Sequence, residues 1–207
     1  MRKVSIKELY EMASGARQSV WDMAQSAGRE PKIYLHWTAG SYTACFPEYH
    51  INITGAGDIY VSTDDLSERK SHTFKRNTGS IGVALCCAYG GGSNNLGDYP
   101  PTNTQIEVMA HVIAVLCKAL WLTIDKAHVM THGEAANNED NMYPHVAYAW
   151  WNDEEGKGDT RGDLEYLEIS ESPSYNPYAT DGSRGGDVLR GKANWYKNKM
   201  EMQEWIG

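Results

Sequence analysis

Apolar residues recur at helical intervals in three parts of the chain and predict a helix in each. The first runs from about residue 5 to 26 and the second from about 104 to 120. Both open with capping-box spacing, in which Ser5 or Thr104 is followed three residues later by a glutamate. The third helix is expected from about residue 188 to 205, so helical segments stand at both ends of the chain.

Shorter runs rich in β-branched and aromatic residues predict strands at 32–36, 49–53, 59–61, 81–88 and 124–131. The second and third of these are joined by a glycine-containing turn, which is typical of a β-hairpin. The run 81–88 is almost wholly apolar, as a buried central strand should be. Helices and strands are thus mixed along the chain, which predicts an α/β fold.

Composition narrows the class of protein. A chain of 207 residues is long enough for one domain with a substantial core, and two full domains would be a tight fit. The net charge of -8 argues against a nucleic-acid partner, because binding the phosphate backbone would require a positively charged surface. No apolar run approaches the roughly 20 residues that span a bilayer, so we expect no membrane partner. The four cysteines lack the Cys-x-x-Cys spacing of a structural zinc knuckle, and buried thiols are expected.

Two histidines stand at the ends of predicted strands. His36 ends the run 32–36 and is followed at once by a turn of small residues, and His132 follows the run 124–131. An imidazole in that setting is held by the sheet but faces a cleft, and two of them make half of a zinc site. A lone histidine is more often a hydrogen-bonded structural residue than a ligand, so neither would suffice alone.

Four segments together resemble the N-acetylmuramoyl-L-alanine amidases of the phage-lysozyme and peptidoglycan-recognition-protein type. The four segments are residues 35–40, 49–53, 80–85 and 131–132. Their order along the chain and the spacing between them match the family. The resemblance covers roughly residues 31 to 168 and implies a single domain in which a central mixed β-sheet is flanked by helices. Residues 1–30 would form an N-terminal helix packed on the domain, 31–170 the zinc amidase domain, and 171–207 a linker and C-terminal extension.

The third metal ligand is the least secure part of the site. A catalytic zinc site takes three protein ligands and a water. In the family the last ligand is a Cys or Asp preceded two positions earlier by a basic residue, and Asp163 with Arg161 resembles that pattern. The loop 137–157 makes the gap after the second histidine long, so four competitors stay open: Asp140, His145, Asp153 and Asp159.

The resemblance implies hydrolysis of the amide bond between N-acetylmuramic acid and L-alanine in peptidoglycan or muropeptides. Zinc would lower the pKa of a bound water towards about 7 and polarise the carbonyl. Tyr49 would position the water and Arg161 would donate to the oxyanion, although a tyrosine packed beneath the sheet is the alternative for Tyr49. Glu134 is a candidate general base, or else it supports His132 or favours the start of the next helix.

Further candidates belong to the substrate cleft. His72 resembles a histidine that relatives place at the cleft, and a surface histidine is the alternative. Trp37 and Thr38, directly after His36, are the other candidate substrate contacts. His50 is expected to be structural or to support the site, and His111 lies off the apolar stripe of its helix and is expected to be exposed.

Three functions therefore stay open: a zinc amidase, a peptidoglycan-binding module without catalysis, and a zinc peptidase acting on stem peptides. Residues 1–8 lack the apolar core of a signal peptide. We expect a monomer made in the cytoplasm that acts on the cell wall if released, or on cytosolic muropeptides. The single Cys45, where animal recognition proteins usually carry a disulfide, favours the bacterial or phage branch, including endolysins.

Overall fold

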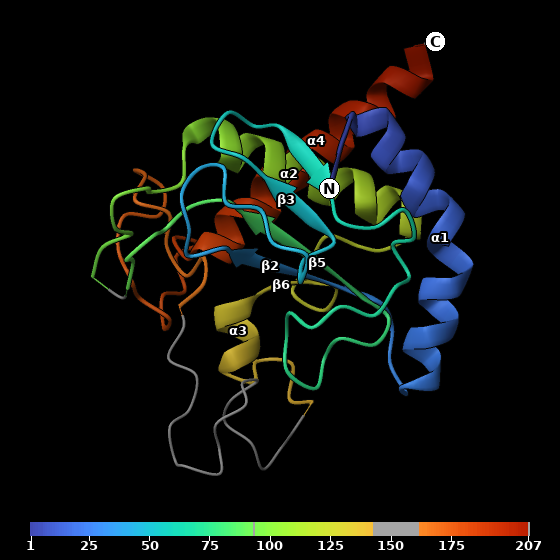
Figure 1. The fold of residues 1–207 in the computed structure, drawn as a ribbon, viewed down its shortest axis with the longest axis horizontal. Coiled ribbons are helices and arrows are strands. Elements are labelled where there is room, and N and C mark those ends of the chain that lie inside the picture. The colour runs from blue at the N-terminus through green and yellow to red at the C-terminus, as the bar shows by residue number, and fades with distance from the viewer. Residues whose placement is uncertain (93, 143–161, 207) are drawn as a thin grey trace.

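The computed structural model of the chain describes residues 1–92, 94–142 and 162–206. In this part of the chain six strands form one mixed sheet, in the order β1-β4-β3-β5-β2-β6 (Figure 1). They are β1 (Arg2–Val4), β2 (Lys32–Trp37), β3 (Ile51–Ile53), β4 (Ile59–Val61), β5 (Ser80–Leu85) and β6 (Val129–Thr131). β3, β5, β2 and β6 run parallel, whereas β4 pairs antiparallel with β3 and β1. The predicted mixed sheet and its hairpin are confirmed.

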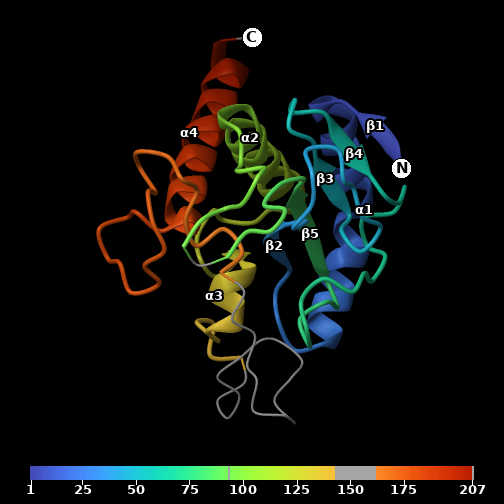
Figure 2. The same ribbon diagram turned by 60° about the vertical axis from the view of Figure 1, so that its left-hand side comes forward.

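Four helices accompany the sheet in the described residues: α1 (Ile6–Ser26), α2 (Asn103–Leu120), α3 (His132–Ala136) and α4 (Gly185–Ile206). α2 packs against both α1 and α4, and the views of Figures 1 and 2 agree that α2 and α4 lie side by side. Because helices pack on it from two sides, α2 is buried on more faces than the single apolar face that the sequence predicts. Val112, Leu116 and Ala119 are among its inaccessible residues. Covering by a second helix explains this excess of buried apolar residues.

The helix ends differ in part from the prediction. Ser5 caps α1 through the predicted capping box with Glu8. The cap of α2 is Thr102 rather than Thr104, so the predicted cap was wrong by two residues. Gln105 decides the register, because its amide also donates to the carbonyl oxygens of Ile53 and Cys86 in the sheet.

Three of the predicted strands are shorter than expected, and β1 was not predicted at all. β3 begins only at Ile51, because the side chain of His50 accepts the Gly82 N–H that a strand residue would otherwise pair with. β6 begins at Val129, because Asp125 accepts the N–H groups of both His128 and Val129 in a turn. A side chain or a turn thus takes up backbone N–H groups at these points, although His50 still donates its own N–H to the Gly82 carbonyl.

The C-terminal helix covers the domain. α4 contacts both α2 and β6, and it begins three residues before the predicted start at 188. His111 of α2 was predicted to be exposed, but its ring stacks on Tyr196 of α4 with 4.7 Å between the ring centroids. None of the helices in the described ranges is both long enough and apolar enough to cross a membrane.

Candidate metal centre

His36 lies near the carboxyl end of β2, which is the neighbour of the edge strand β6. β2 is flanked by two parallel strands, and His36 pairs in register with Ala84 of β5. Both residues are completely buried. β5 therefore fixes the backbone of His36, while β6 pairs with the residues just before it, and the imidazole is held at the edge where parallel strands end.

His132 reaches the same edge from the next strand. Leu35 of β2 pairs with Thr131 of β6, so the residues that follow them, His36 and His132, are neighbours. Their ring centroids are 4.9 Å apart. His132 is the first residue of α3, and the Thr131 side chain caps that helix with Glu134 in a capping box. The strand end and the cap together fix the position of the second imidazole.

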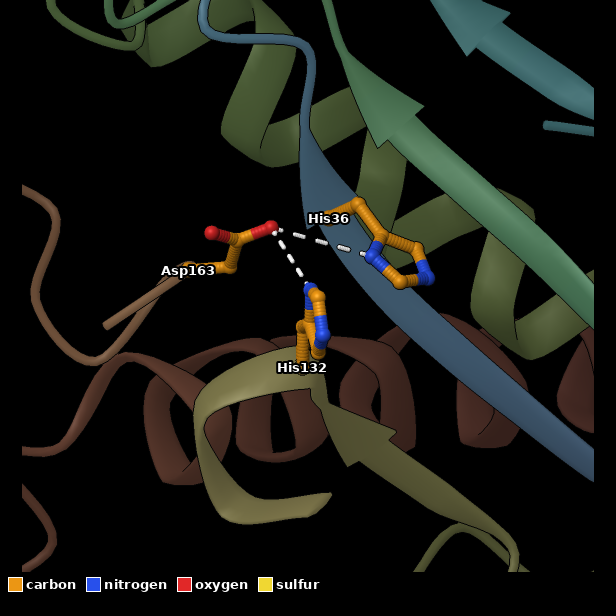
Figure 3. A group of neighbouring side chains, drawn as sticks. All are labelled: His36, His132 and Asp163. Carbon is orange, nitrogen blue, oxygen red and sulfur yellow. Dashed lines mark hydrogen bonds and ion pairs between the residues drawn. The ribbon is translucent and has the colours of Figure 1, made fainter. Parts of the chain in front are cut away.

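Asp163 completes the group from a distant part of the sequence. Its Oδ2 atom lies 3.1 Å from Nδ1 of His132 and 3.7 Å from Nδ1 of His36, and Figure 3 shows the carboxylate facing both rings. One ligand atom from each residue lies within 4.8 Å of the other two, and all three side chains are buried. The structure thus brings together the three residues that the sequence nominated as ligands.

The charge of the group matches a cation. Burial alone would raise the pKa of Asp163, but the neighbouring rings of His132 and His36 hold it below its usual range, so the carboxylate is ionised. Among the described residues, its Oδ1 atom has no hydrogen-bond partner although it is buried. A buried carboxylate oxygen without a partner is costly, and a metal ion would satisfy it. Two imidazole nitrogens and one carboxylate oxygen are also the donor types of catalytic zinc sites, so the group can hold a metal ion.

His72 packs on the far side of His36. Nδ1 of His72 lies 3.2 Å from Nε2 of His36, and only 5% of the residue is exposed. Burial, and then the nearby His36, His50 and His132, lower the pKa of His72 well below its usual value. The alternative of a surface histidine was therefore wrong. The segment around His72 lines a cavity of about 340 Å³ whose other residues are Arg69, Ser71, Thr73, Phe74, Lys75 and Asn77.

His50 is tied to the backbone through both ring nitrogens. Nδ1 accepts from the N–H of Gly82 at 3.0 Å, and Nε2 donates to the carbonyl of Glu68 at 2.7 Å. These two bonds require a neutral ring, and burial accordingly lowers the pKa of His50 to about 4. The ring links β5 to the loop after β4.

Three candidate residues lie next to His36 in sequence or in space: Tyr49, Trp37 and Thr38. The Tyr49 ring lies 5.0 Å from the His36 ring, and its hydroxyl donates to the Trp37 carbonyl at 3.4 Å. Trp37 is almost buried and Thr38 is half-buried. The Thr38 hydroxyl oxygen is buried and has no hydrogen-bond partner in the described part of the chain.

Glu134 is held by other groups. Both of its carboxylate oxygens accept from the Arg190 guanidinium of α4, at 2.7 and 2.8 Å, and one of them also accepts from the Thr131 N–H. Only 1% of the residue is exposed. This geometry favours the supporting role over that of a base, because Glu134 anchors the start of α3, and with it His132, to α4. Sequence reasoning missed Arg190, whose partner lies 56 positions away.

Of the remaining candidate residues, one is bound by side chains away from the metal-binding group, and four lie outside the described residues. Asp140 accepts from Arg76 at 2.7 and 3.1 Å and lies 3.3 Å from the Lys32 amine, so its oxygens are occupied away from the group of three. Arg161, the predicted oxyanion donor, lies outside the residues that the structure describes. The same holds for three of the competing ligands: His145, Asp153 and Asp159.

Comparisons with known proteins give one informative match. A family model described as N-acetylmuramoyl-L-alanine amidase matches residues 24–145. The wild-type Drosophila protein PGRP-LB is similar in structure, with 16% identity over 57% of this chain and 83% of its own and a TM-score of 0.39. Drosophila peptidoglycan recognition protein SA has 14% identity over 58% of this chain and 82% of its own, with a TM-score of 0.38. Both scores indicate only a partial likeness. No curated protein matches the chain.

Proposed function

Because the chain belongs to the N-acetylmuramoyl-L-alanine amidase family, we propose that it hydrolyses the amide between N-acetylmuramic acid and L-alanine in peptidoglycan or muropeptides. The family implies peptidoglycan as substrate or ligand. The observation that carries the proposal is the buried group of His36, His132 and Asp163, whose ligand atoms lie within 4.8 Å of one another. We propose that these residues hold zinc through two Nδ1 atoms and one carboxylate oxygen.

The proposed chemistry divides between the metal and the residues around it. Zinc in such a site is a Lewis acid that polarises the amide carbonyl and lowers the pKa of water. Tyr49, whose ring lies against His36, orients the attacking water or donates to the developing charge. Arg161, assigned from the sequence alone, donates to the oxyanion. Thr38 and Trp37 contact the substrate next to the metal.

We assign no proton transfer to Glu134. Its two oxygens are occupied by Arg190 and by the Thr131 N–H, and the carboxylate is buried. A base must reach the proton that it removes, and this carboxylate would first have to leave a charged partner.

The test is the identification of the bond that is cut. Purified peptidoglycan and a defined muropeptide would be incubated with the chain as purified, after chelation, and after zinc is restored. We expect products with a free amino-terminal L-alanine and an intact muramic acid, formed only when zinc is present, as mass spectrometry would show. Cleavage inside the stem peptide would indicate a zinc peptidase instead. Binding without cleavage by the zinc-loaded chain would indicate a recognition module.

A matched variant makes the result specific. Asp163→Ala should lose both zinc and hydrolysis. Asp181→Ala, which removes an exposed carboxylate that accepts from the Ser183 N–H, should lose neither. Hydrolysis that survives in Asp163→Ala would contradict the proposed centre.

A further inference from the structure

His36 uses both of its ring nitrogens, and each faces a different group. Nδ1 faces Asp163, with 3.7 Å to Oδ2, and Nε2 lies 3.2 Å from Nδ1 of His72 (Figure 3 shows the first of these contacts). A neutral imidazole carries one proton on one of its two nitrogens. If Nδ1 gives its lone pair to a metal, the proton must lie on Nε2. His36 is then the donor and His72 the acceptor of the bond between them.

A glycine in the neighbouring strand leaves room for the His72 ring. A Cβ atom at Gly82, in the middle of β5, would come within 2.7 Å of Cγ of His72. Glycine weakens a strand interior and often marks a place where another group approaches closely. Here that group is the His72 ring, which lies against the strand at this point. Any side chain at position 82 would push the ring away from His36.

The loop that carries His72 is closed by one side chain. Oδ1 of Asn77 accepts from the N–H groups of His72 at 3.1 Å and of Thr73 at 2.8 Å. The Thr73 hydroxyl lies 3.0 Å from Nδ1 of His72 and 3.4 Å from Nε2 of His36, so it is a second polar neighbour of the contact between the two rings. With all these groups buried, water does not compete for the proton of His36.

We propose that His72 is a positioning residue for the metal centre. It accepts the Nε2 proton of His36 and so keeps His36 in the tautomer and orientation whose Nδ1 lone pair faces Asp163 and His132. The inference rests on the proposed function, because it takes Nδ1 as the metal-binding atom. Metal-bound histidines usually donate their second N–H to a carboxylate, a carbonyl or a water. In this chain an imidazole takes that place.

The test compares two substitutions that differ in the acceptor. His72→Leu removes it while leaving an apolar group of similar reach, whereas His72→Asn keeps an oxygen close to the position of Nδ1. Zinc affinity would be measured by competition with a chromogenic chelator, and the His36 tautomer by ¹⁵N NMR of the zinc-loaded chain. We expect His72→Leu to weaken zinc binding roughly 10- to 100-fold, as losses of such partners do, and His72→Asn to recover most of the affinity.

Two further variants keep the test decisive. Gly82→Ala leaves His72 in the sequence but displaces its ring, so it should weaken zinc binding in the same direction, and it decides the matter if His72→Leu does not fold. His111→Leu is the control, because His111 stacks on Tyr196 away from the centre and its loss should not change zinc affinity. Circular dichroism would establish which variants are folded.

The outcomes separate this inference from the proposed function. If the wild-type chain binds zinc but folded His72→Leu binds it equally tightly, the positioning role is wrong and the amidase proposal stands. If zinc affinity depends on His72 but the loaded chain cuts no muramoyl amide, the amidase proposal is wrong and the positioning role stands. If the wild-type chain binds no zinc, both are wrong.

Discussion

Asp163 and His132 lie 31 positions apart in the sequence, yet Oδ2 of the first is 3.1 Å from Nδ1 of the second. Each residue is only 1% exposed. Two polar groups buried this close together stabilise each other, because separating them out of reach of water would cost the hydrogen bond between them. The proposed ligand set is therefore organised by the fold before a metal arrives.

The first prediction concerns Asp163. Asp163→Ala removes one of three proposed ligands, so zinc affinity should fall by more than the roughly 100-fold that the loss of an outer partner costs. His36→Ala and His132→Ala should behave alike. Metal content after dialysis, measured by atomic absorption, checks this, with Asp181→Ala as the surface control. Stoichiometric zinc and wild-type turnover in Asp163→Ala would move the third ligand to another residue, with those at 143–161 as the next candidates.

The second prediction is that removal of the metal leaves the fold in place. The apolar core joins the sheet to α1, α2 and α4 without the proposed ligands, and includes Leu9, Val20, Leu35, Val83, Ile113 and Leu189. Unlike a zinc finger, such a chain does not depend on zinc to fold. The chelated chain should keep its far-ultraviolet circular dichroism and a cooperative melt, with Tm rising when zinc is added. Loss of all secondary structure on chelation would contradict this.

The third prediction separates zinc binding from turnover at Tyr49. Tyr49→Phe removes only the hydroxyl and keeps the ring that packs on His36, so zinc content should not change. Loss of a donor to developing charge costs roughly two to three orders of magnitude in kcat. Parallel measurements of zinc content and kcat would check it. An unchanged kcat would leave Tyr49 as a packing residue, which is the alternative that the sequence also allows.

Two of the three proposed ligands, His36 and His132, could be predicted from the sequence for a physical reason. Parallel strands end at the same edge of a sheet, so histidines at the ends of two predicted strands are brought together once those strands are neighbours. Asp163 has no such local signal. It was nominated through the family resemblance, and the family model that supports the resemblance ends at residue 145.

The supporting contacts could not be predicted from the chain. Arg190 pairs with Glu134 across 56 positions, and His72 meets His36 only because Gly82 leaves room for its ring. Each contact depends on how α4 and the loop after β4 pack, which local patterns do not encode. β1 was missed for another reason, since three residues are too few to show alternation.

The fourth prediction is a loss of stability at mildly acidic pH through His50. Burial lowers its pKa to about 4; Lys70 lowers it further, while the Glu68 carbonyl and the charges of Glu68 and Asp65 oppose the shift. An unfolded histidine titrates near 6.5, so between these values the unfolded chain binds the proton and the folded chain does not. This contribution is full above about pH 6.5 and is lost as the pH falls towards 4, by on the order of 3 kcal/mol.

Urea unfolding across that range checks the prediction on His50. His50→Asn keeps an acceptor for the Gly82 N–H but cannot titrate, so its free energy of unfolding should depend less on pH between 6.5 and 4 than that of the wild-type chain. Equal pH dependence in the two proteins would show that His50 is not the group responsible.

The last prediction concerns Asp140 and the buried Arg76. The Arg76 side chain is fully buried and donates to both oxygens of Asp140, at 3.1 and 2.7 Å, while Lys32 lies 3.3 Å from the same carboxylate. Burial alone would raise the pKa of Asp140, but the hydrogen bonds and charge of Arg76, and then the charge of Lys32, lower it to about 2. An unfolded aspartate titrates near 4. As the pH falls below that value the unfolded chain takes up the proton first, so this stability is present above about pH 4 and lost towards pH 2.

Asp140→Asn should therefore act in two ways. At pH 7 it replaces the carboxylate that accepts from the buried Arg76 guanidinium with a neutral amide. The free energy of unfolding should fall by roughly 1.5 to 3 kcal/mol, the contribution of a hydrogen bond between charged groups. Between pH 4 and 2 the variant should lose less further stability than the wild-type chain, because the titrating group is gone. Asp64→Asn is the control, since Asp64 pairs with Arg2 on the surface with 86% of its side chain exposed, and such pairs contribute little. Urea unfolding at pH 7 and pH 3 decides the matter. An Asp140→Asn chain as stable as wild type at pH 7 would mean that the carboxylate of Asp140 is not needed to stabilise the buried Arg76 side chain.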